Sequence, residues 1–320
     1  MTASIDCLET LVTDSLQEAA RLLQQGELVI FPTETVYGLG ANALDVQAVA
    51  GIYRAKQRPA DNPLIVHIYD FAQLDQLAYA VPDYAWELAH TFFPGPITLL
   101  LPKRSIVPDA TTAGSPKICL RMPSSPIALA FLKECEVPVA APSANLSGRP
   151  SPTRWQDCLE DMAGRVAAIL KGPEATFGLE STIVDCTGPS PVLMRPGAVS
   201  LEELALVRPD ISLNQTHSSL TLPGMKYRHY APNAQVHLLA PGEKPALHKQ
   251  AVAYIGLSKP GFIPAYTLQL TSLAEYAHQL FAFFRECDRQ GISSIYAERV
   301  SEEGLGRAIM NRLGKAAARI

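Results

Sequence analysis

Two basic residues lie four positions apart in a short apolar run, PKICLRMP at residues 116–123. In a strand, alternate side chains point to the same face, so Lys117 and Arg121 would share one face while Ile118, Leu120 and Met122 point to a core. Two cations would therefore lie side by side on one face of the sheet. A solvated strand face is the simpler alternative, and this segment alone leaves both open.

A second cationic pair, Lys56 and Arg58, closes a short helix and precedes a turn bounded by prolines. This placement suits the capture of an anion, although basic residues at a helix C-terminus usually interact with the helix dipole. After the turn, His67 interrupts the apolar run LIVHI at residues 64–68. A lone histidine in such a run is more often a hydrogen-bonded core residue than a ligand, so both interpretations stay open.

The segment AAPSANLSG, residues 140–148, leaves a buried strand and enters a loop of small polar residues. Loops at strand ends are where open α/β sheets bind ligands. Small side chains let backbone N–H groups approach a phosphate, and Ser143 and Asn145 add donors at alternate positions. An ordinary turn would use the same composition.

Two later segments repeat this design, because Ser181 lies beside one strand and Arg195 ends another. The chain has 27 Lys and Arg against 31 Asp and Glu, a net charge of −4, so no overall basic field indicates a nucleic-acid-binding protein. Cations nevertheless gather at the ends of elements, which predicts a local electrostatic clamp on a polyphosphate. They are Lys56, Arg58, Lys117, Arg121 and Arg195.

The usual nucleotide and metal signatures are absent or misplaced. Lys315 is followed by Ala316, which excludes a P-loop. GLGANA at residues 38–43 resembles a dinucleotide fingerprint, but a polar stretch separates it from the preceding strand, whereas the true fingerprint turns directly off its strand. The histidines lack metal-ligand spacing and the six cysteines form no Cys-x-x-Cys, so no metal site built by the protein is expected.

The elements that must position these residues mix strand and helix over the first 200 residues, which predicts an α/β or α+β domain. A helix capped by Thr13 or Asp14 and ended by Gly26 comes first, before a buried strand at residues 28–31. Further strands are expected at 64–68, 98–101 and 137–141, and helices at 48–55 and 84–91.

The composition changes near residue 209, where many turn formers and little apolar periodicity predict a long linker. A capping box at Ser272 and Glu275 opens the first helix of a small β-α-β-α tail. Its elements are expected at 251–257, 273–287, 292–297 and 306–318. The expected organisation is a domain of residues 1–208, a linker or lid of 209–234 and a Rossmann-like domain of 235–320.

No apolar run approaches the roughly 18 residues of a membrane span, and the N-terminus lacks the basic start and apolar core of a secretory signal. Scattered cysteines fit a reducing compartment. We therefore expect a cytoplasmic protein that does not bind membranes.

A long string, FPTETVYGLGANA at residues 31–43, is followed in order by KQRP at 56–59, NPLIVH at 62–67, FPGPIT at 93–98 and PSANLSG at 142–148. Together these motifs resemble the YrdC-type threonylcarbamoyl-AMP synthases, including the K-x-R and S-x-N pairs of that family. The segment KYRHYAP at 226–232 and the tail resemble the longer, two-domain members. The resemblance therefore covers nearly the whole chain.

The resemblance implies an α/β fold with a twisted, open, mixed sheet and a concave, cationic face. It implies a nucleotidyltransferase that converts L-threonine, bicarbonate and ATP into L-threonylcarbamoyladenylate and pyrophosphate. A carbamate of threonine would attack the α-phosphorus of ATP, which needs positioning and positive charge but no protein nucleophile. The product serves threonylcarbamoyladenosine formation in tRNA, so the implied partner is a downstream tRNA threonylcarbamoyl transferase complex, without stable binding of nucleic acid by this chain.

By motif match, the resemblance assigns the site residues to groups. L-Threonine would be held by Thr35, His67, Arg121, Ala141 and Ser181. ATP would be held by Arg58, Asn62, Lys117, Ser143, Ser151, Arg195 and Tyr230. The catalytic signature pairs would be Lys56 with Arg58 and Ser143 with Asn145. Tyr230 would close over the nucleotide, and Mg²⁺ is expected with ATP, held by phosphates and water rather than by a protein cage.

Three other functions stay open. A concave basic face could bind RNA, although the acidic total and the lack of aromatic residues among the cations weigh against it. A nicotinamide oxidoreductase would depend on Gly38 and Gly40 rather than on Arg58. A relative that carbamoylates another acceptor would not require threonine.

Overall fold

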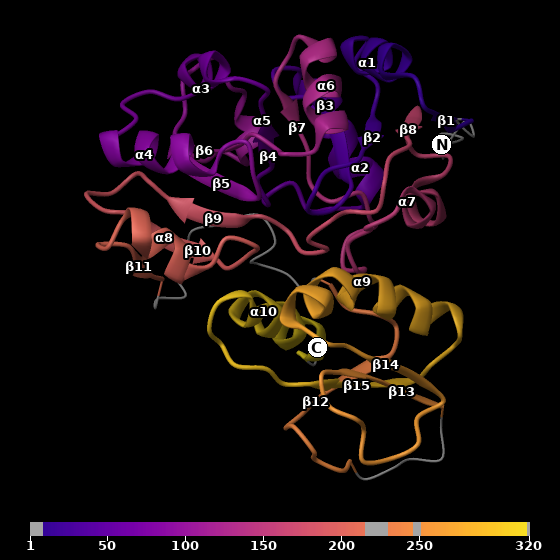
Figure 1. Ribbon diagram of the computed structural model, residues 1–320. Helices are drawn as coiled ribbons and strands as arrows, with labels where there is room; N and C mark the ends of the chain where they lie inside the picture. Colours follow the sequence, from indigo (N-terminus) through magenta and orange to yellow (C-terminus); the bar gives the residue numbers. More distant parts are fainter. Residues whose placement is uncertain (1–8, 215–229, 246–250, 319–320) are drawn as a thin grey trace.

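The computed structural model describes residues 9–214, 230–245 and 251–318. These residues form two units, each built on its own sheet (Figure 1). The large sheet has eleven strands in the order β1-β8-β2-β3-β7-β4-β6-β5-β9-β10-β11, and the small sheet has four in the order β12-β15-β13-β14.

Strands and helices alternate through the large unit. Its strands are β1 (Leu11–Thr13), β2 (Val29–Phe31), β3 (Gly38–Asn42), β4 (Ile65–His67), β5 (Ile97–Pro102), β6 (Lys117–Arg121), β7 (Val139–Ala140), β8 (Ala168–Leu170), β9 (Thr182–Asp185), β10 (Val192–Arg195) and β11 (Ser212–Leu213). Its helices are α1 (Leu16–Gln24), α2 (Val46–Lys56), α3 (Phe71–Leu77), α4 (Asp83–Phe92), α5 (Asp109–Thr112), α6 (Pro126–Cys135), α7 (Trp155–Met162) and α8 (Leu201–Val207).

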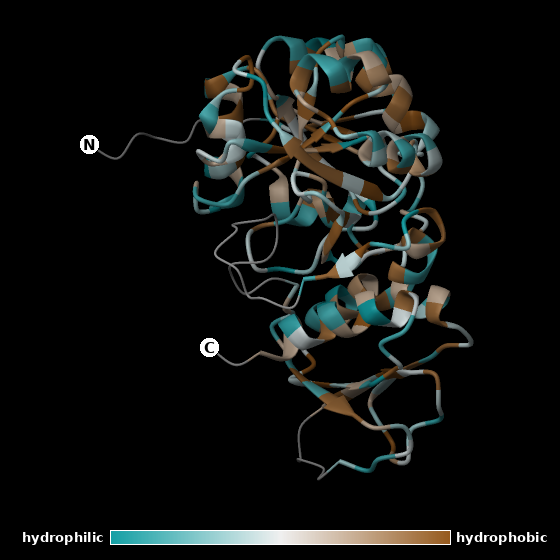
Figure 2. Cartoon of the chain, turned by 90° about the vertical axis from the view of Figure 1, so that its left-hand side faces the viewer, coloured by the Kyte–Doolittle hydropathy of each residue, from teal (hydrophilic) through white to brown (hydrophobic). Residues whose placement is uncertain are grey.

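The large sheet is mixed, as the sequence predicts. β4 runs parallel to β6, whereas β5 runs antiparallel to β6 and β2 antiparallel to β3. Strands at the centre of this unit are largely hydrophobic in Figure 2, while the surrounding helices carry mixed colours. The predicted α/β class with an open mixed sheet is confirmed.

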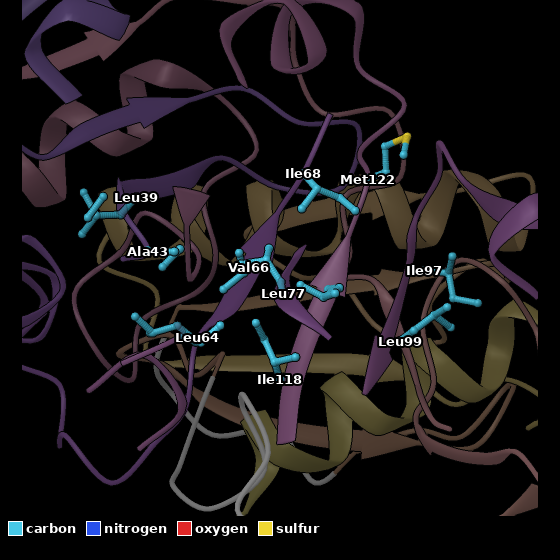
Figure 3. Close-up of a cluster of buried hydrophobic side chains, with 14 of the residues drawn as sticks. Leu39, Ala43, Leu64, Val66, Ile68, Leu77, Ile97, Leu99, Ile118 and Met122 are labelled. Carbon is cyan, nitrogen blue, oxygen red and sulfur yellow. The ribbon is translucent and has the colours of Figure 1, made fainter. Parts of the chain in front are cut away.

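Alternation along β2 shows how the sheet is buried on both faces. Val29 and Phe31 pack with apolar residues of α1 and α6, whereas Ile30 between them belongs to the core on the opposite face. Figure 3 shows that opposite core, where Val66 and Ile118 come from neighbouring strands. A strand buried on both faces places the groups at its end within a rigid frame.

The cap of the first helix lies one residue after Asp14 and two after Thr13, the two predicted caps. Ser15 is the N-cap of α1, and its side chain accepts a hydrogen bond from the backbone N–H of Glu18 at 3.2 Å. Thr13 instead accepts from the N–H of Ser15 at 3.0 Å. Gly26 follows the end of the helix with a φ of +87°, a conformation that favours glycine.

The two glycines of the dinucleotide alternative lie inside a strand. Gly38 and Gly40 both belong to β3, which pairs antiparallel with β2. A Cβ at Gly40 would lie 3.0 Å from the side chain of Val139, so close packing against β7 explains the absence of a side chain there. The glycines do not form the strand-to-helix turn that a dinucleotide fingerprint needs.

The small unit has more strands than the predicted β-α-β-α pattern. Its strands are β12 (Gln235–Leu239), β13 (Val252–Gly256), β14 (Tyr266–Gln269) and β15 (Ser294–Glu298), and its helices are α9 (Leu273–Arg289) and α10 (Leu305–Ala317). β12 and β14 are the additions. All pairs in the sheet are parallel, and both helices lie between the small sheet and the large unit (Figure 1).

The capping box predicted at the start of α9 is only half formed. Ser272 accepts from the backbone N–H of Glu275 at 3.2 Å, as predicted. The carboxylate of Glu275 accepts instead from the backbone N–H of Thr271 at 2.7 Å, one residue before the cap. A complete box occurs at α8, where Ser200 and Glu203 exchange both bonds.

The predicted linker, residues 209–234, lies only partly within the described residues. Residues 212 and 213 form β11, which pairs parallel with β10, so the first part of the segment 209–234 extends the large sheet. Residues 215–229, including most of the KYRHYAP segment, lie outside the described residues. The division at residues 208 and 234 stays a prediction.

Among the described residues, no helix is both long enough and apolar enough to cross a bilayer. The five cysteines described are buried and carry free thiols. Burial raises the pKa of several of these thiols, which leaves them as small core residues.

Candidate functional site

A cavity lies where the large sheet meets Tyr230 at the entry to the small unit. Three arginines, Arg58, Arg121 and Arg195, reach it from the end of α2, from β6 and from β10. Nine of the residues predicted for the site line this cavity. They are Thr35, Arg58, His67, Arg121, Ala141, Ser143, Ser181, Arg195 and Tyr230.

Arg121 stands at the end of β6 and is paired with a carboxylate. Its Nη2 lies 2.6 Å from Oε1 of Glu34, and both side chains are buried. The Nε of Arg121 has no hydrogen-bond partner among the described residues, and neither has Oε2 of Glu34. Arg121 therefore keeps a buried donor available at the cavity wall.

His67 lies beside Arg121 across the parallel pair of β4 and β6. Its ring meets that of Phe31 edge to face at 5.7 Å, and its Nδ1 has no hydrogen-bond partner in the described part of the chain. Burial and the neighbouring Arg121 lower the pKa of His67 to about 3. The histidine is therefore neutral at neutral pH, and it lines the cavity with its Nδ1 unpaired among the described residues.

Lys56, the last residue of α2, does not line the cavity. Its ammonium donates to the backbone carbonyls of Ser143 and Asn145 and is almost fully buried. Burial, with Arg58 nearby, holds its pKa well below the usual range. Lys56 thus fixes the loop that carries the predicted serine and asparagine, from behind.

Within that loop, Ser143 faces the cavity and Asn145 braces it. The hydroxyl of Ser143 donates to Oδ1 of Asn145, whose amide donates to the carbonyls of Leu146 and Arg149 at 2.8 and 2.9 Å. The asparagine is buried and does not line the cavity. In the S-x-N pair, Ser143 therefore faces the cavity and Asn145 supports the loop behind it.

Arg58 follows a left-handed residue, Gln57, whose φ of 52° turns the chain away from the axis of α2. Its Nη2 donates to the carbonyls of Asn62 and Pro63 at 3.3 and 3.1 Å, while its Nε has no partner among the described residues. Burial lowers the pKa of Arg58 to about 10. Asn62 is buried behind this guanidinium, and its side-chain amide makes no hydrogen bond within the described residues.

Arg195 ends β10 and is held by Ser181. Its Nε and Nη2 donate to the carbonyl of Ser181 at 3.1 and 2.8 Å, and Nη2 also reaches its hydroxyl at 3.1 Å. That hydroxyl lies 2.7 Å from the hydroxyl of Thr98 on β5. Burial holds the pKa of Arg195 below its ordinary value.

Thr35, which precedes β3, and Ala141, which follows β7, also line the cavity. The hydroxyl of Thr35 lies 2.9 Å from that of Thr33, within a turn where Thr33 also accepts from backbone N–H groups. Ala141 follows β7, and its N–H donates to the carbonyl of Ile65 at 2.8 Å. The small side chain of Ala141 leaves space in the cavity, and the hydroxyl of Thr35 makes its wall polar.

Five predicted residues are not brought to the cavity wall. They are Lys56, Asn62, Lys117, Asn145 and Ser151. Lys117 instead pairs with Asp185 at 3.0 Å on the neighbouring part of the sheet, and Ser151 donates to Glu180. Strand alternation placed Lys117 and Arg121 on one face correctly, but only Arg121 reaches the cavity.

The acidic partners are what the sequence reasoning missed. Glu34 and Glu180 both lie inside or beside the motifs that point to the site, yet only their neighbours received roles. A buried arginine requires a partner, so the clustering of predicted cations was itself a signal for nearby carboxylates. Arg312, which pairs with Glu180 at 2.9 Å, carries no such signal, because it lies on an amphipathic helix far along the chain.

Within residues 9–214, 230–245 and 251–318, no group of three His, Cys, Asp or Glu side chains could hold a metal ion. The two carboxylates beside the cavity are each ion-paired with an arginine. A divalent cation would therefore find no protein cage in the described part of the site.

Comparison with known proteins covers nearly the whole chain. Residues 21–197 match the family of Sua5, YciO and YrdC proteins, described as "Telomere recombination", and residues 199–318 match "Threonylcarbamoyl-AMP synthase, C-terminal domain". The threonylcarbamoyl-AMP synthase of Pyrococcus abyssi is 44% identical over 99% of this chain and 98% of its own length. That of Bacillus subtilis is 41% identical over 98% and 96%.

Solved structures extend the likeness to the fold. P. abyssi Sua5, in a structure complexed with L-threonine, is 42% identical to this chain, with a TM-score of 0.88 and coverage of 97% of both chains. E. coli YciO, at 24% identity and a TM-score of 0.54, shares the fold over 61% of this chain. The chain therefore belongs to the threonylcarbamoyl-AMP synthase family.

Proposed function

We propose that this chain synthesises L-threonylcarbamoyladenylate from L-threonine, bicarbonate and ATP, with release of pyrophosphate. Membership of the family supports the reaction class. The observation that carries the proposal is the convergence of Arg58, Arg121 and Arg195 on one cavity. Guanidinium groups bind carboxylates and phosphates through paired donors, and both ligand types occur in these substrates.

Threonine is assigned to the part of the cavity around Arg121 and His67. The Nε of Arg121 and the Nδ1 of His67 are buried polar atoms without hydrogen-bond partners among the described residues, and a carboxylate and a hydroxyl would supply what they lack. Thr35, Ala141 and Ser181 add hydroxyl and backbone groups to the same wall. The P. abyssi relative crystallised with L-threonine supports threonine as a ligand of this chain.

ATP is assigned to the part of the cavity around Arg58, Ser143 and Arg195, with Tyr230 closing it. Asn62, Lys117 and Ser151 stand behind or beside this wall, so their expected effect on ATP is through the residues that they touch. Mg²⁺ would be coordinated mainly by phosphate oxygens and water, since the described residues offer no cage.

The chemistry then follows from charge. Threonine's amine and bicarbonate give a carbamate and water, and a carbamate oxygen forms a bond to the α-phosphorus while the bond to the β-phosphate oxygen breaks. Negative charge accumulates on phosphoryl oxygens and on pyrophosphate, which arginines in a buried site stabilise. No side chain needs to form a covalent bond, so Lys56 can remain sequestered behind its loop.

The product is a mixed anhydride that water would hydrolyse. Its use in tRNA threonylcarbamoylation by a separate transferase in the cytoplasm, and the assignment of the enzyme as a nucleotidyltransferase, belong to this same proposal. Tyr230 is 5% exposed and lines the cavity, a position that suits the exclusion of water from the intermediate.

The test is pyrophosphate release from ATP and Mg²⁺, with threonine and bicarbonate each omitted in turn and the adenylate detected by mass. We expect release only when both are present. Serine in place of threonine provides the matched substrate control. Release of pyrophosphate without threonine, or no release with all components, would contradict the proposal and favour a relative that carbamoylates another acceptor or binds RNA.

A further inference from the structure

Helix α10 of the small unit buries an arginine against the cavity of the large unit. Arg312 is 0% exposed and, with Arg285, is one of the two largest side chains that are fully buried among the described residues. A guanidinium so far from water must be paired and hydrogen-bonded to remain charged without a large penalty. Its partners therefore show what it stabilises.

Those partners lie on two neighbouring segments of the cavity wall. Nε of Arg312 donates to Oε2 of Glu180 at 2.9 Å and Nη2 to the carbonyl of Glu180 at 3.3 Å. Nη1 donates to the carbonyl of Pro196 at 2.8 Å. Glu180 precedes Ser181 and Pro196 follows Arg195, so one guanidinium joins the two segments that carry these cavity residues.

Glu180 is the only acidic side chain among the described residues that line the cavity. Burial alone would raise its pKa, but Arg312 and Arg195 together with the hydroxyl of Ser151 hold the pKa below the ordinary value. The carboxylate is therefore ionised. Without Arg312 it would repel phosphate oxygens and attract the guanidinium of Arg195 at short range in a medium of low dielectric constant.

The same guanidinium supports Tyr230. Its Cζ lies 5.4 Å from the centre of the Tyr230 ring, and Phe281 of α9 stacks on that ring at 5.4 Å. Tyr230 has a φ of 68°, a backbone conformation that non-glycine residues hold only when the surroundings fix it. Arg312, Phe281 and Lys315, whose Nζ lies 5.7 Å from the ring centre, supply those surroundings from the small unit.

We propose that Arg312 is a positioning residue for nucleotide binding, through which the small unit takes part in the site. It neutralises Glu180, which leaves Arg195 directed to the nucleotide, and it seats Tyr230 over the cavity. The proposal rests on the proposed function, because it takes ATP as the ligand of Arg195. Through Arg312, the small unit would thus contribute to nucleotide binding.

The experiment compares Arg312→Met with wild type. We expect the KM for ATP to rise at least about tenfold, since removing one partner of a buried charge pair leaves the other unpaired. The KM for threonine should change less than about threefold, because Arg121 and Glu34 are untouched. In Glu180→Gln/Arg312→Met, where no carboxylate is left unpaired, the KM for ATP should return to within about threefold of that of Glu180→Gln alone.

Two control variants separate charge from helix packing. Arg307 lies on α10, like Arg312, and forms an exposed ion pair with Glu202 of α8. Arg307→Met removes this pair and should leave both KM values unchanged. Arg312→Lys keeps the charge, and its KM for ATP should stay well below that of Arg312→Met. If Arg312→Met fails to fold, the lysine variant and the double variant still decide the question.

An unchanged KM for ATP in Arg312→Met, or a double variant that remains as impaired as Arg312→Met, would overturn the proposal. ATP affinity measured by calorimetry in the absence of threonine distinguishes this failure from that of the proposed function. If wild type binds ATP but releases no pyrophosphate with threonine and bicarbonate, the proposed reaction fails. The order of ATP affinities among the variants would still support or refute the role of Arg312.

Discussion

Each arginine of the cavity is fixed by a specific partner. Arg121 is held by Glu34, Arg195 by the backbone and hydroxyl of Ser181, and Arg58 by two carbonyls that follow it in the chain. A guanidinium already held in place loses little side-chain entropy when it binds a further anion. At the scale of single residues, the partners matter as much as the cations.

Replacement of Arg121 tests the division of the cavity. We expect Arg121→Ala to raise the KM for threonine on the order of 30-fold or more, because it removes the buried donor assigned to the carboxylate. The KM for ATP should rise far less. Lys117→Ala should act in the opposite sense, with the larger effect on ATP. Steady-state kinetics with each substrate varied in turn measures both.

Arg121→Ala also leaves Glu34 buried without its partner, so a second variant is needed. Arg121→Ala/Glu34→Gln removes the stranded carboxylate and should recover stability without recovering threonine binding. Equal effects of Arg121→Ala and Lys117→Ala on both substrates would contradict the separate substrates assigned to these two residues.

His67 makes the free energy of unfolding depend on pH. Its pKa is lowered from 6.5 to about 3, so the unfolded chain takes up a proton as the pH falls below about 6.5 while the folded chain does not. The stability tied to this ring is complete above pH 6.5 and is lost as the pH falls towards 3. Between pH 7.5 and pH 5 the loss should be about 2 kcal/mol.

Urea unfolding of wild type and His67→Asn at the two pH values measures this loss. The free energy of unfolding should fall further with pH in wild type than in the variant. Parallel changes in the two proteins would show that His67 does not remain neutral in the folded state.

At the scale of elements, backbone periodicity could be predicted and side-chain pairing could not. Alternation put Arg121 on the correct face of β6, and the small polar residues after β7 correctly marked a loop at the site. Lys56 was placed at the right helix end, yet it turns inward to two carbonyls. Spacing along one element says nothing of which buried acceptor a neighbouring loop presents.

The segment before β9 packs on α9 so closely that a side chain would not fit. Gly178 has a φ of +71°, and a Cβ there would lie 2.4 Å from the carbonyl oxygen of His278. We expect Gly178→Ala to destabilise the protein beyond the roughly 1 kcal/mol that the left-handed conformation costs an alanine. The excess should appear as a lower urea midpoint.

Gly114 provides a control with the same backbone conformation. Its φ is +77°, and a methyl group in place of its hydrogen would meet no atom within 4 Å, so Gly114→Ala incurs only the conformational cost. A loss of stability as small in Gly178→Ala as in Gly114→Ala would mean that the segment can move away from α9.

At the scale of the whole molecule, α9 is fastened to the large unit by ion pairs with α7. Arg285 donates to Asp161 at 2.8 Å and to the carbonyl of Pro150, and Arg289 donates to Asp157 at 2.5 Å. Asp161 also accepts from the N–H of Leu146, in the loop after β7. The small unit is therefore joined to the loop that carries Ser143 and Asn145.

This junction was beyond the reach of sequence reasoning. The apolar stripe of residues 273–287 predicts the helix, and the arginines on its other side have the pattern of an ordinary solvated face. More than a hundred residues separate Arg285 from Asp161, so their pairing depends on how two finished units meet. Local patterns specify elements, whereas the contacts between units follow from the whole fold.

The ion pair of Arg285 with Asp161 should make the two units unfold together. Arg285→Met leaves Asp161 buried with only Arg149 as charged partner among the described residues, and we expect a loss of about 3 kcal/mol or more in the free energy of unfolding. Calorimetry should show one transition in wild type and a lower or divided one in the variant. Arg307→Met, which removes an exposed pair between the units, should change stability by less than about 1 kcal/mol.

An Arg285→Met protein with the wild-type transition would mean that the remaining ion pairs and the apolar contacts hold the units together without Arg285. Tyr230, Val36 and Leu179 share one apolar cluster with α9 and α10, so such contacts exist. Apolar contacts, however, resist separation without fixing a single orientation, whereas a buried guanidinium loses its hydrogen bonds when its partner shifts. If the ion pair sets the orientation, Arg285→Met should also raise the KM for ATP, because α9 supports Tyr230 through Phe281.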